Sequence, residues 1–224
     1  MSLLFIALAP VIVILIYIYI KDKYEKEPLS FLFENFILGA IVSIIVTLVL
    51  GYFIQRLFPI TNKESIIQQF IKAFFIVGFV EEFSKYIIVR YHAQKNAEFN
   101  EPFDGIVYAL VVSMGFAALE NIIYVYQYGF TTGLTRAFTA IPAHATFGIL
   151  MGYFMGKAKF SKNNVKYNLL GLLVATVFHG AYDFFLFLDF LPGIAIGAFI
   201  SLLIGVLLSK KAITKHQDIS QFKT

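Results

Sequence analysis

Ionisable side chains lie inside stretches of this sequence that are otherwise apolar enough to cross a membrane. Seven such residues are spread over four stretches: Glu81, Glu82, Lys85, Glu120, His144, His179 and Asp183. Insertion scales place an isolated Asp, Lys or Arg at mid-helix at a cost of roughly 2.5–3.5 kcal/mol. We therefore expect the seven side chains to face one shared interior site, where they pair with one another or meet water.

Carboxylates and imidazoles together favour acid–base chemistry on water. Adjacent Glu81 and Glu82 point about 100° apart on a helix, so they cannot form a carboxylate pair on one face. One of them would activate water while the other orients a neighbour, and the sequence leaves open which does what. Glu82, His144 and His179 are the residues we expect to hold a divalent metal such as zinc, if a metal is bound, with a fourth position for water. Without a metal, the two imidazoles would stabilise an oxyanion.

Helical spacing gives supporting roles to other members of the set. Residues four apart share a helix face, so Lys85 lies over Glu81, where it would set carboxylate charge, and Asp183 lies beside His179, which it would orient. Glu120 would complete the site. Arg136 lies nearer the end of its stretch, and we expect it to reach the membrane surface in a structural role.

The whole chain is too apolar for a water-soluble globule, and its apolar runs are long enough to cross the membrane as helices. Of its 224 residues, 59% are apolar and 14% are charged, and no cysteine is present to supply a disulfide, a thiol nucleophile or a thiolate ligand. The sequence predicts an all-α, polytopic transmembrane bundle of about seven helices. The expected spans are 3–20, 31–54, 67–89, 105–127, 135–156, 167–187 and 191–208.

Positive charge predicts the orientation of this bundle. With the N-terminus outside, the inner segments and the tail hold thirteen Lys and Arg residues, whereas the outer segments hold three. This bias places the C-terminus in the cytoplasm and explains the net charge of +4 by contact with the lipid bilayer, with no need for nucleic acid. The ionisable set would then lie between the membrane midplane and the outer leaflet.

No loop is long enough to fold separately. We expect residues 1–209 to form a single transmembrane domain and residues 210–224 to be a disordered, basic cytoplasmic tail. Gly148, Gly152 and Gly156 form a stripe of small residues that predicts close helix packing, either inside the bundle or in a homo-oligomer.

The same residues carry a resemblance to a known family. The stretch Glu81-Glu82-Phe-Ser-Lys85 resembles the Glu-Glu-x-x-Lys motif of the PrsW family of bacterial intramembrane proteases, which are related to the type II CAAX prenyl endopeptidases. Phe116-x-x-x-Glu120-Asn121 resembles the second motif of that family, and His144 and His179-x-x-x-Asp183 match the remaining two. Glu25-Lys-Glu27-Pro28 resembles the acidic segment that follows the first helix.

This resemblance implies an intramembrane endopeptidase of the bacterial plasma membrane. It further implies cleavage of a membrane-protein substrate such as a single-pass anti-sigma factor, in or just outside the bilayer. The alternatives are a proton- or ion-coupled transporter that uses the buried carboxylates, and a catalytically inactive membrane scaffold. The absence of a clear internal repeat disfavours the transporter.

Overall fold

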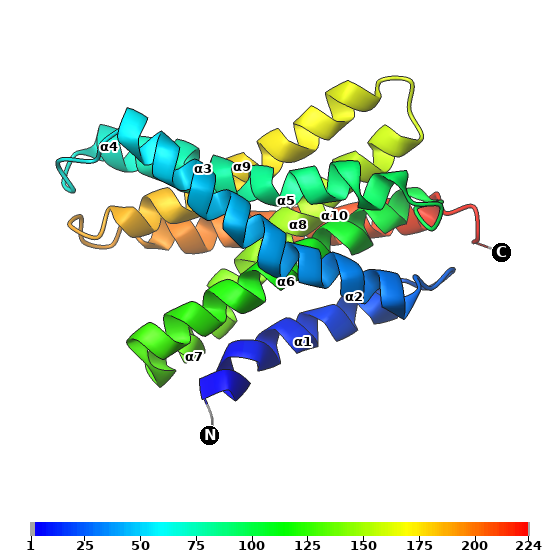
Figure 1. The fold of residues 1–224 in the computed structure, drawn as a ribbon, viewed down its shortest axis with the longest axis horizontal. Helices are drawn as coiled ribbons and strands as arrows, with labels where there is room; N and C mark the ends of the chain where they lie inside the picture. The colour runs from blue at the N-terminus through cyan, green and yellow to red at the C-terminus, as the bar shows by residue number, and fades with distance from the viewer. Residues whose placement is uncertain (1–2, 224) are drawn as a thin grey trace.

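The computed structural model describes residues 3–223, and these residues form a helical bundle without strands (Figure 1). In chain order the helices are α1 (Leu3–Lys21), α2 (Leu29–Leu38), α3 (Ile44–Leu57), α4 (Ile66–Ile71), α5 (Phe79–Tyr91), α6 (Pro102–Tyr128), α7 (Phe130–Phe138), α8 (Ala140–Lys159), α9 (Asn164–Phe187) and α10 (Ile196–Asp218). Two π-helical segments, η1 (Gly39–Ser43) and η2 (Lys72–Gly78), join α2 to α3 and α4 to α5, and the 3-10 turn η3 (Ala93–Lys95) follows α5.

The helices therefore form seven continuous or nearly continuous rods in the described chain, as the sequence predicts. Six of them are long and apolar enough to cross a membrane. The rod 66–91, which joins α4, η2 and α5, is not among the six, because it carries Lys72 and the charged residues of α5. The chain is therefore a multi-pass membrane protein whose least apolar long helix carries much of the ionisable set.

The connections alternate between the two ends of the bundle. In Figure 1, the connections 22–28 and 92–101 and the C-terminus lie at the right, and the connections 58–65 and 188–195 lie at the left. This alternation gathers the lysine-rich segments at one end. We refer to that end as the inner end and to the opposite end as the outer end, following the orientation that the charges predict.

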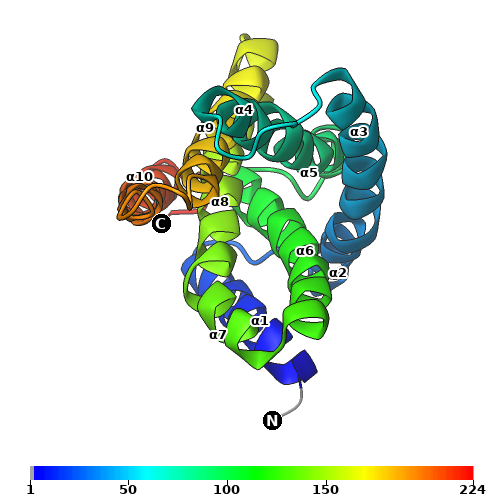
Figure 2. The same ribbon diagram turned by 90° about the vertical axis from the view of Figure 1, so that its left-hand side faces the viewer.

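Helix α6 lies at the centre, between α8 on one side and the α2–α3 rod on the other (Figure 2). A Cβ added at Gly152 would overlap the carbonyl oxygen of Gly105, and one added at Gly156 would overlap that of Pro102. Gly148 lies against α6 in the same way. The glycine stripe therefore packs inside the bundle of one chain, which is one of its two predicted uses.

The predicted span 135–156 is divided into α7 and α8 at Thr139. Pro142 explains the break, because it has no N–H to donate to the carbonyl of Phe138, four residues earlier. The two helices pack together with α6 and α1, so the break changes direction without separating the segment from the bundle.

The last helix differs from its predicted range at both ends. It begins at Ile196, because Pro192 and Gly193 form a turn in which Gly193 has a φ of +78°. It continues to Asp218, so the expectation that residues 210–224 are disordered is wrong for 210–218. Ala212, Ile213 and His216 are buried along this extension, which anchors it to the bundle.

Candidate active site

Helix α5 brings three charged side chains into the bundle within five residues, Glu81, Glu82 and Lys85. Lys85 Nζ lies 2.7 Å from Glu82 Oε1 and 3.7 Å from Glu81 Oε2. Lys85 and Glu82 are almost fully buried, whereas Glu81 retains limited access to solvent. The lysine therefore compensates the charge of both carboxylates, and its shorter contact is to Glu82 at i−3 rather than to Glu81 at i−4 as expected.

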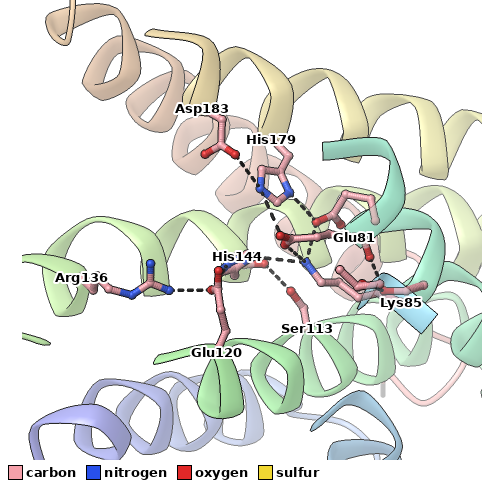
Figure 3. Close-up of polar contacts among 11 residues, drawn as sticks. Glu81, Lys85, Ser113, Glu120, Arg136, His144, His179 and Asp183 are labelled. Atoms are coloured by element: carbon pink, nitrogen blue, oxygen red, sulfur yellow. Dashed lines mark hydrogen bonds and ion pairs between the residues drawn. The ribbon is translucent and has the colours of Figure 1, made fainter. Parts of the chain in front are cut away.

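His179 on α9 joins this group from the opposite side, as Figure 3 shows. Its Nδ1 lies 2.9 Å from Glu82 Oε1, while its Nε2 lies 3.5 Å from Asp183 Oδ2 and 3.9 Å from Glu81 Oε2. Phe147 stacks on the imidazole with ring centroids 4.8 Å apart. The ring is thus fixed by Glu82 and Phe147, with Nε2 directed toward Glu81 and Asp183.

His144 on α8 has a similar arrangement. Its Nε2 lies 3.0 Å from Glu120 Oε2, and its Nδ1 lies 3.3 Å from Lys85 Nζ. Ser113 on α6 donates a 2.7 Å hydrogen bond to the backbone carbonyl of His144. Each of the two histidines therefore has one ring nitrogen against a glutamate and the other directed into the cluster.

Arg136 belongs to the site, contrary to the expectation that it reaches the membrane surface. Its Nη2 donates to Glu120 Oε2 at 2.6 Å, and its Nε donates to Asn121 Oδ1 at 2.8 Å. Asn121 in turn donates to the backbone carbonyl of Ala7 at 2.8 Å, so it also links α6 to α1. One signal in the sequence pointed to this role: Glu120 needed a cation, and Lys85 was already assigned to Glu81.

A cavity of about 520 Å³ opens beside this cluster. Glu81, Glu120, His144, His179 and Asp183 line it, whereas Glu82 and Lys85 do not. Its other walls come from α7, from the last turn of α9 and from the start of α10, which lie at the outer end of the bundle. The structure thus brings all seven predicted residues together and divides them into five that face the cavity and two that lie behind it.

The donor atoms that face one another fit a divalent metal, with one change from the expected ligand set. Glu81, His144 and His179 each offer one ligand atom, and these atoms lie within 4.8 Å of one another. Glu81 Oε2 and Glu82 Oε2 are both buried without a hydrogen bond, but of these two residues only Glu81 lines the cavity. Glu82 is not part of this group, because its Oε1 is held by Lys85 and His179 and the residue lies outside the cavity. A His₂Glu donor set with each imidazole backed by a carboxylate is typical of catalytic zinc sites.

Comparison with known proteins agrees with this geometry. Residues 27–209 match the model of the PrsW family, which is described as a family of intramembrane metalloproteases. The chain is 37% identical over 186 residues to Protease PrsW of Geobacillus kaustophilus, covering 83% of this chain and 80% of the relative. It is 38% identical over 182 residues to Protease PrsW of Bacillus subtilis, covering 80% of each protein.

A third relative, Protease PrsW of Oceanobacillus iheyensis, is 40% identical over 187 residues, with 83% of each chain covered. No solved structure matches the chain significantly. The relatives are proteases, which favours the peptidase interpretation over the transporter. The chain belongs to the PrsW family of intramembrane metalloproteases and is a multi-pass membrane peptidase.

Proposed function

We propose that Glu81, His144 and His179 hold one divalent metal, and that this metal is zinc. The observation that carries the proposal is that Glu81, at the cavity wall, offers an oxygen within 4.8 Å of two imidazoles that each have one nitrogen committed to a glutamate. A His₂Glu set with an open position is a common donor set of zinc peptidases. When bound, such an ion supplies Lewis-acid activation of water and of the scissile carbonyl.

The remaining residues of the site position these ligands. Glu82 and Glu120 accept hydrogen bonds from His179 and His144, which fixes the tautomer and orientation of each ring. Lys85 and Arg136 form ion pairs with the two glutamates and so compensate their charge inside the membrane. Neither Glu82 nor Lys85 contacts the cavity, so both act through their neighbours.

Asp183 is the carboxylate best placed to exchange protons with the reacting water and the leaving amine. It lines the cavity, and its one ion-pair contact among residues 3–223 is the 3.5 Å approach to His179 Nε2. Glu120 also lines the cavity, but Arg136 and His144 both hold its Oε2. A carboxylate with fewer committed bonds can move its proton more easily during a reaction.

The substrate we propose is a membrane-anchored protein, for example a single-pass anti-sigma factor, cut near the outer membrane surface. A second cavity of about 470 Å³ lies next to the first, and the two share Lys72, Val77, Leu186 and Phe187 in their walls. Together they extend from the ligand cluster to the outer end of α3, where Gln55 lies, and to the start of the connection 58–65. An extended segment that emerges from the membrane can enter along this path.

The proposal is tested with the full chain in proteoliposomes and the single-pass anti-sigma factor of the same bacterium as substrate. We expect cleavage on the outer side of its transmembrane segment, loss of activity on chelation, and recovery with stoichiometric zinc. Asp183→Asn should retain zinc and lose turnover, whereas Glu81→Gln should lose zinc. Retention of stoichiometric zinc by inactive Glu81→Gln would instead assign Glu81 as the base, and full activity in the chelated protein would contradict the metal site.

A further inference from the structure

A second cluster of carboxylates lies at the inner end of the bundle, where the connection 22–28 meets the start of α6. Its central members are Glu25, Glu27 and Asp104, each of which offers a ligand atom within 4.8 Å of the others. Glu27 is 3% exposed and Asp104 is fully buried. Asp22 and Glu101 are buried nearby. The active-site residues Glu81, His144 and His179 form a separate group, so this cluster has no part in the chemistry described above.

Each of the three central carboxylates uses one oxygen to bind the protein. Glu25 Oε1 accepts from the Asn100 side chain at 2.9 Å, and Glu27 Oε2 accepts from the Tyr108 hydroxyl. Asp104 Oδ2 accepts the backbone N–H groups of Asn100 and Glu101 at 2.6 Å and 2.7 Å. These bonds hold the three side chains in place and leave a second oxygen on each.

The second oxygens have no partner. Glu25 Oε2, Glu27 Oε1 and Asp104 Oδ1 are all buried without a hydrogen bond. Leaving one buried acceptor unsatisfied costs about 1–3 kcal/mol, and more if the group is charged. Three such oxygens at one place mean that the cluster, as the protein alone presents it, lacks a compensating group.

No basic side chain supplies that compensation. Among residues 3–223, no Lys, Arg or His forms an ion pair with any of these three carboxylates. Lys26 Nζ donates to the backbone carbonyls of Tyr19 and Asp22, and Lys159 Nζ donates to that of Gln94. Burial and the nearby Asp104 carboxylate raise the pKa of Glu27 accordingly. The nearest lysines thus bind backbone carbonyls and do not neutralise the three carboxylates.

We propose that Glu25, Glu27 and Asp104 bind a hard divalent cation, Mg²⁺ or Ca²⁺, at the inner end of the bundle. An all-oxygen donor set without His or Cys favours these ions over zinc. Oxygens on opposite sides of a Ca²⁺ ion lie about 4.6–5.2 Å apart, and those around Mg²⁺ about 4.0–4.2 Å, so a set within 4.8 Å of one another accommodates either ion with little movement. The bound ion would join the connection between α1 and α2 to the first turn of α6.

Mn²⁺ is a suitable probe, because it prefers oxygen ligands and is visible by electron paramagnetic resonance. The measurement uses the full chain in detergent, both as wild type and as His179→Ala, which weakens the active-site metal. We expect one Mn²⁺ per chain in both, displaced by Mg²⁺ or Ca²⁺, with a saturable rise in Tm. Competition between the two ions identifies which one binds more tightly.

Variants of the cluster make the test specific. Glu27→Gln and Glu25→Gln should each weaken Mn²⁺ binding by roughly tenfold or more, whereas Glu98→Gln, an exposed neutralisation on the connection 92–101, should leave it unchanged. Glu25 is only partly buried, so its variant remains informative if Glu27→Gln does not fold. Unchanged Mn²⁺ affinity in Glu25→Gln or Glu27→Gln overturns the proposal. Loss of Mn²⁺ binding in folded His179→Ala also overturns it. So does a wild-type protein that binds no Mn²⁺ and shows the infrared band of a protonated carboxyl group, if Glu27→Gln removes that band.

Discussion

Glu81 and Glu82 are neighbours in the chain, yet the bundle gives them different surroundings. Glu81 faces the cavity, whereas Glu82 lies outside it with its Oε1 held between Lys85 and His179. If Glu81 is a metal ligand and Glu82 only orients the ligand His179, loss of charge at the two positions should affect metal affinity differently. Substitution by glutamine tests this difference, because it keeps the shape and removes the charge.

We expect Glu82→Gln to reduce zinc affinity about 10- to 100-fold, the usual effect of losing a residue that orients a metal ligand. Glu81→Gln should reduce it beyond that range, because a ligand is removed. Zinc content after dialysis against a graded chelator measures both. Glu64→Gln, on an exposed connection, serves as the matched control and should behave as wild type. Equal zinc loss in the two variants would contradict the division of roles.

Arg136 holds two acceptors at once, which only its guanidinium can do. It donates through Nη2 to Glu120 and through Nε to Asn121. Lysine offers one compact ammonium and cannot keep both bonds. A hydrogen bond to a charged group contributes about 1.5–3 kcal/mol, so we expect Arg136→Lys to lower kcat roughly 10- to 150-fold and Arg136→Gln to lower it further. KM should change little, since the arginine positions Glu120; a rise in KM with unchanged kcat would instead indicate a substrate contact.

At the scale of elements, the sequence indicated the helices but not the local changes in their geometry. Periodicity and hydropathy located seven rods, and the pairs Glu81–Lys85 and His179–Asp183 were recognised from their spacing. The π-helical segment η2 lies immediately before α5 and shifts the phase of the residues that follow. The sequence offered Glu82 as the metal ligand, whereas in the structure Glu81 lies near His144 and His179 and Glu82 lies outside the cavity. The role of Arg136 was missed for a related reason, since the turn at Thr139 decides where α7 points.

The packing of α6 against α8 depends on glycine at the crossing. A Cβ at Gly152 would overlap the backbone of Gly105, and backbone atoms can move aside only if the helices separate. Adding atoms to a filled contact typically costs about 1–3 kcal/mol, so Gly152→Ala should lower the free energy of unfolding by that amount or more. Since α6 carries Glu120 and α8 carries His144, activity should fall as well.

Gly51→Ala is the matched control for this substitution. No atom lies within 4 Å of a Cβ built at Gly51, in the middle of α3. Alanine in a helix interior is favoured over glycine by about 0.5–1 kcal/mol, so the control should be neutral or stabilising. Unfolding of both variants in mixed detergent micelles by a graded denaturant provides the comparison. A similar loss of stability in the two would mean that the α6–α8 contact does not require glycine.

At the scale of the whole molecule, the lysine-rich segments gather at one end and the cavity opens toward the other. The sequence predicts that the end with many lysines is cytoplasmic, which places the active site on the outer side. The chain has no cysteine, so a single introduced cysteine reports its own position without background. Lys63 and Lys162 are exposed lysines on connections at opposite ends of the bundle.

We expect Lys63→Cys to react with a membrane-impermeant maleimide added to intact cells, and Lys162→Cys to react only after the cells are opened. Gel electrophoresis of the labelled protein measures the fraction of each variant that has reacted, in intact and in opened cells. Each variant removes one lysine, so they are matched in charge. Labelling of Lys162→Cys in intact cells, with protection of Lys63→Cys, would invert the orientation and place the cavity on the cytoplasmic side.

The rod 66–91 also has a consequence for how the protein is made. It carries Glu81, Glu82 and Lys85, and it is the one long rod of residues 3–223 too polar to count as a span. A translocon would not release such a segment into lipid alone, since each central charge opposes insertion by several kcal/mol. We expect it to enter the bilayer only after α6, α8 and α9 have been synthesised, because these helices supply Phe116, His144 and His179 as its contacts. Assembly of the active site and insertion of this rod are therefore coupled: a chain truncated before α9 lacks His179, one of the two partners of Glu82, and we expect it to insert this rod poorly.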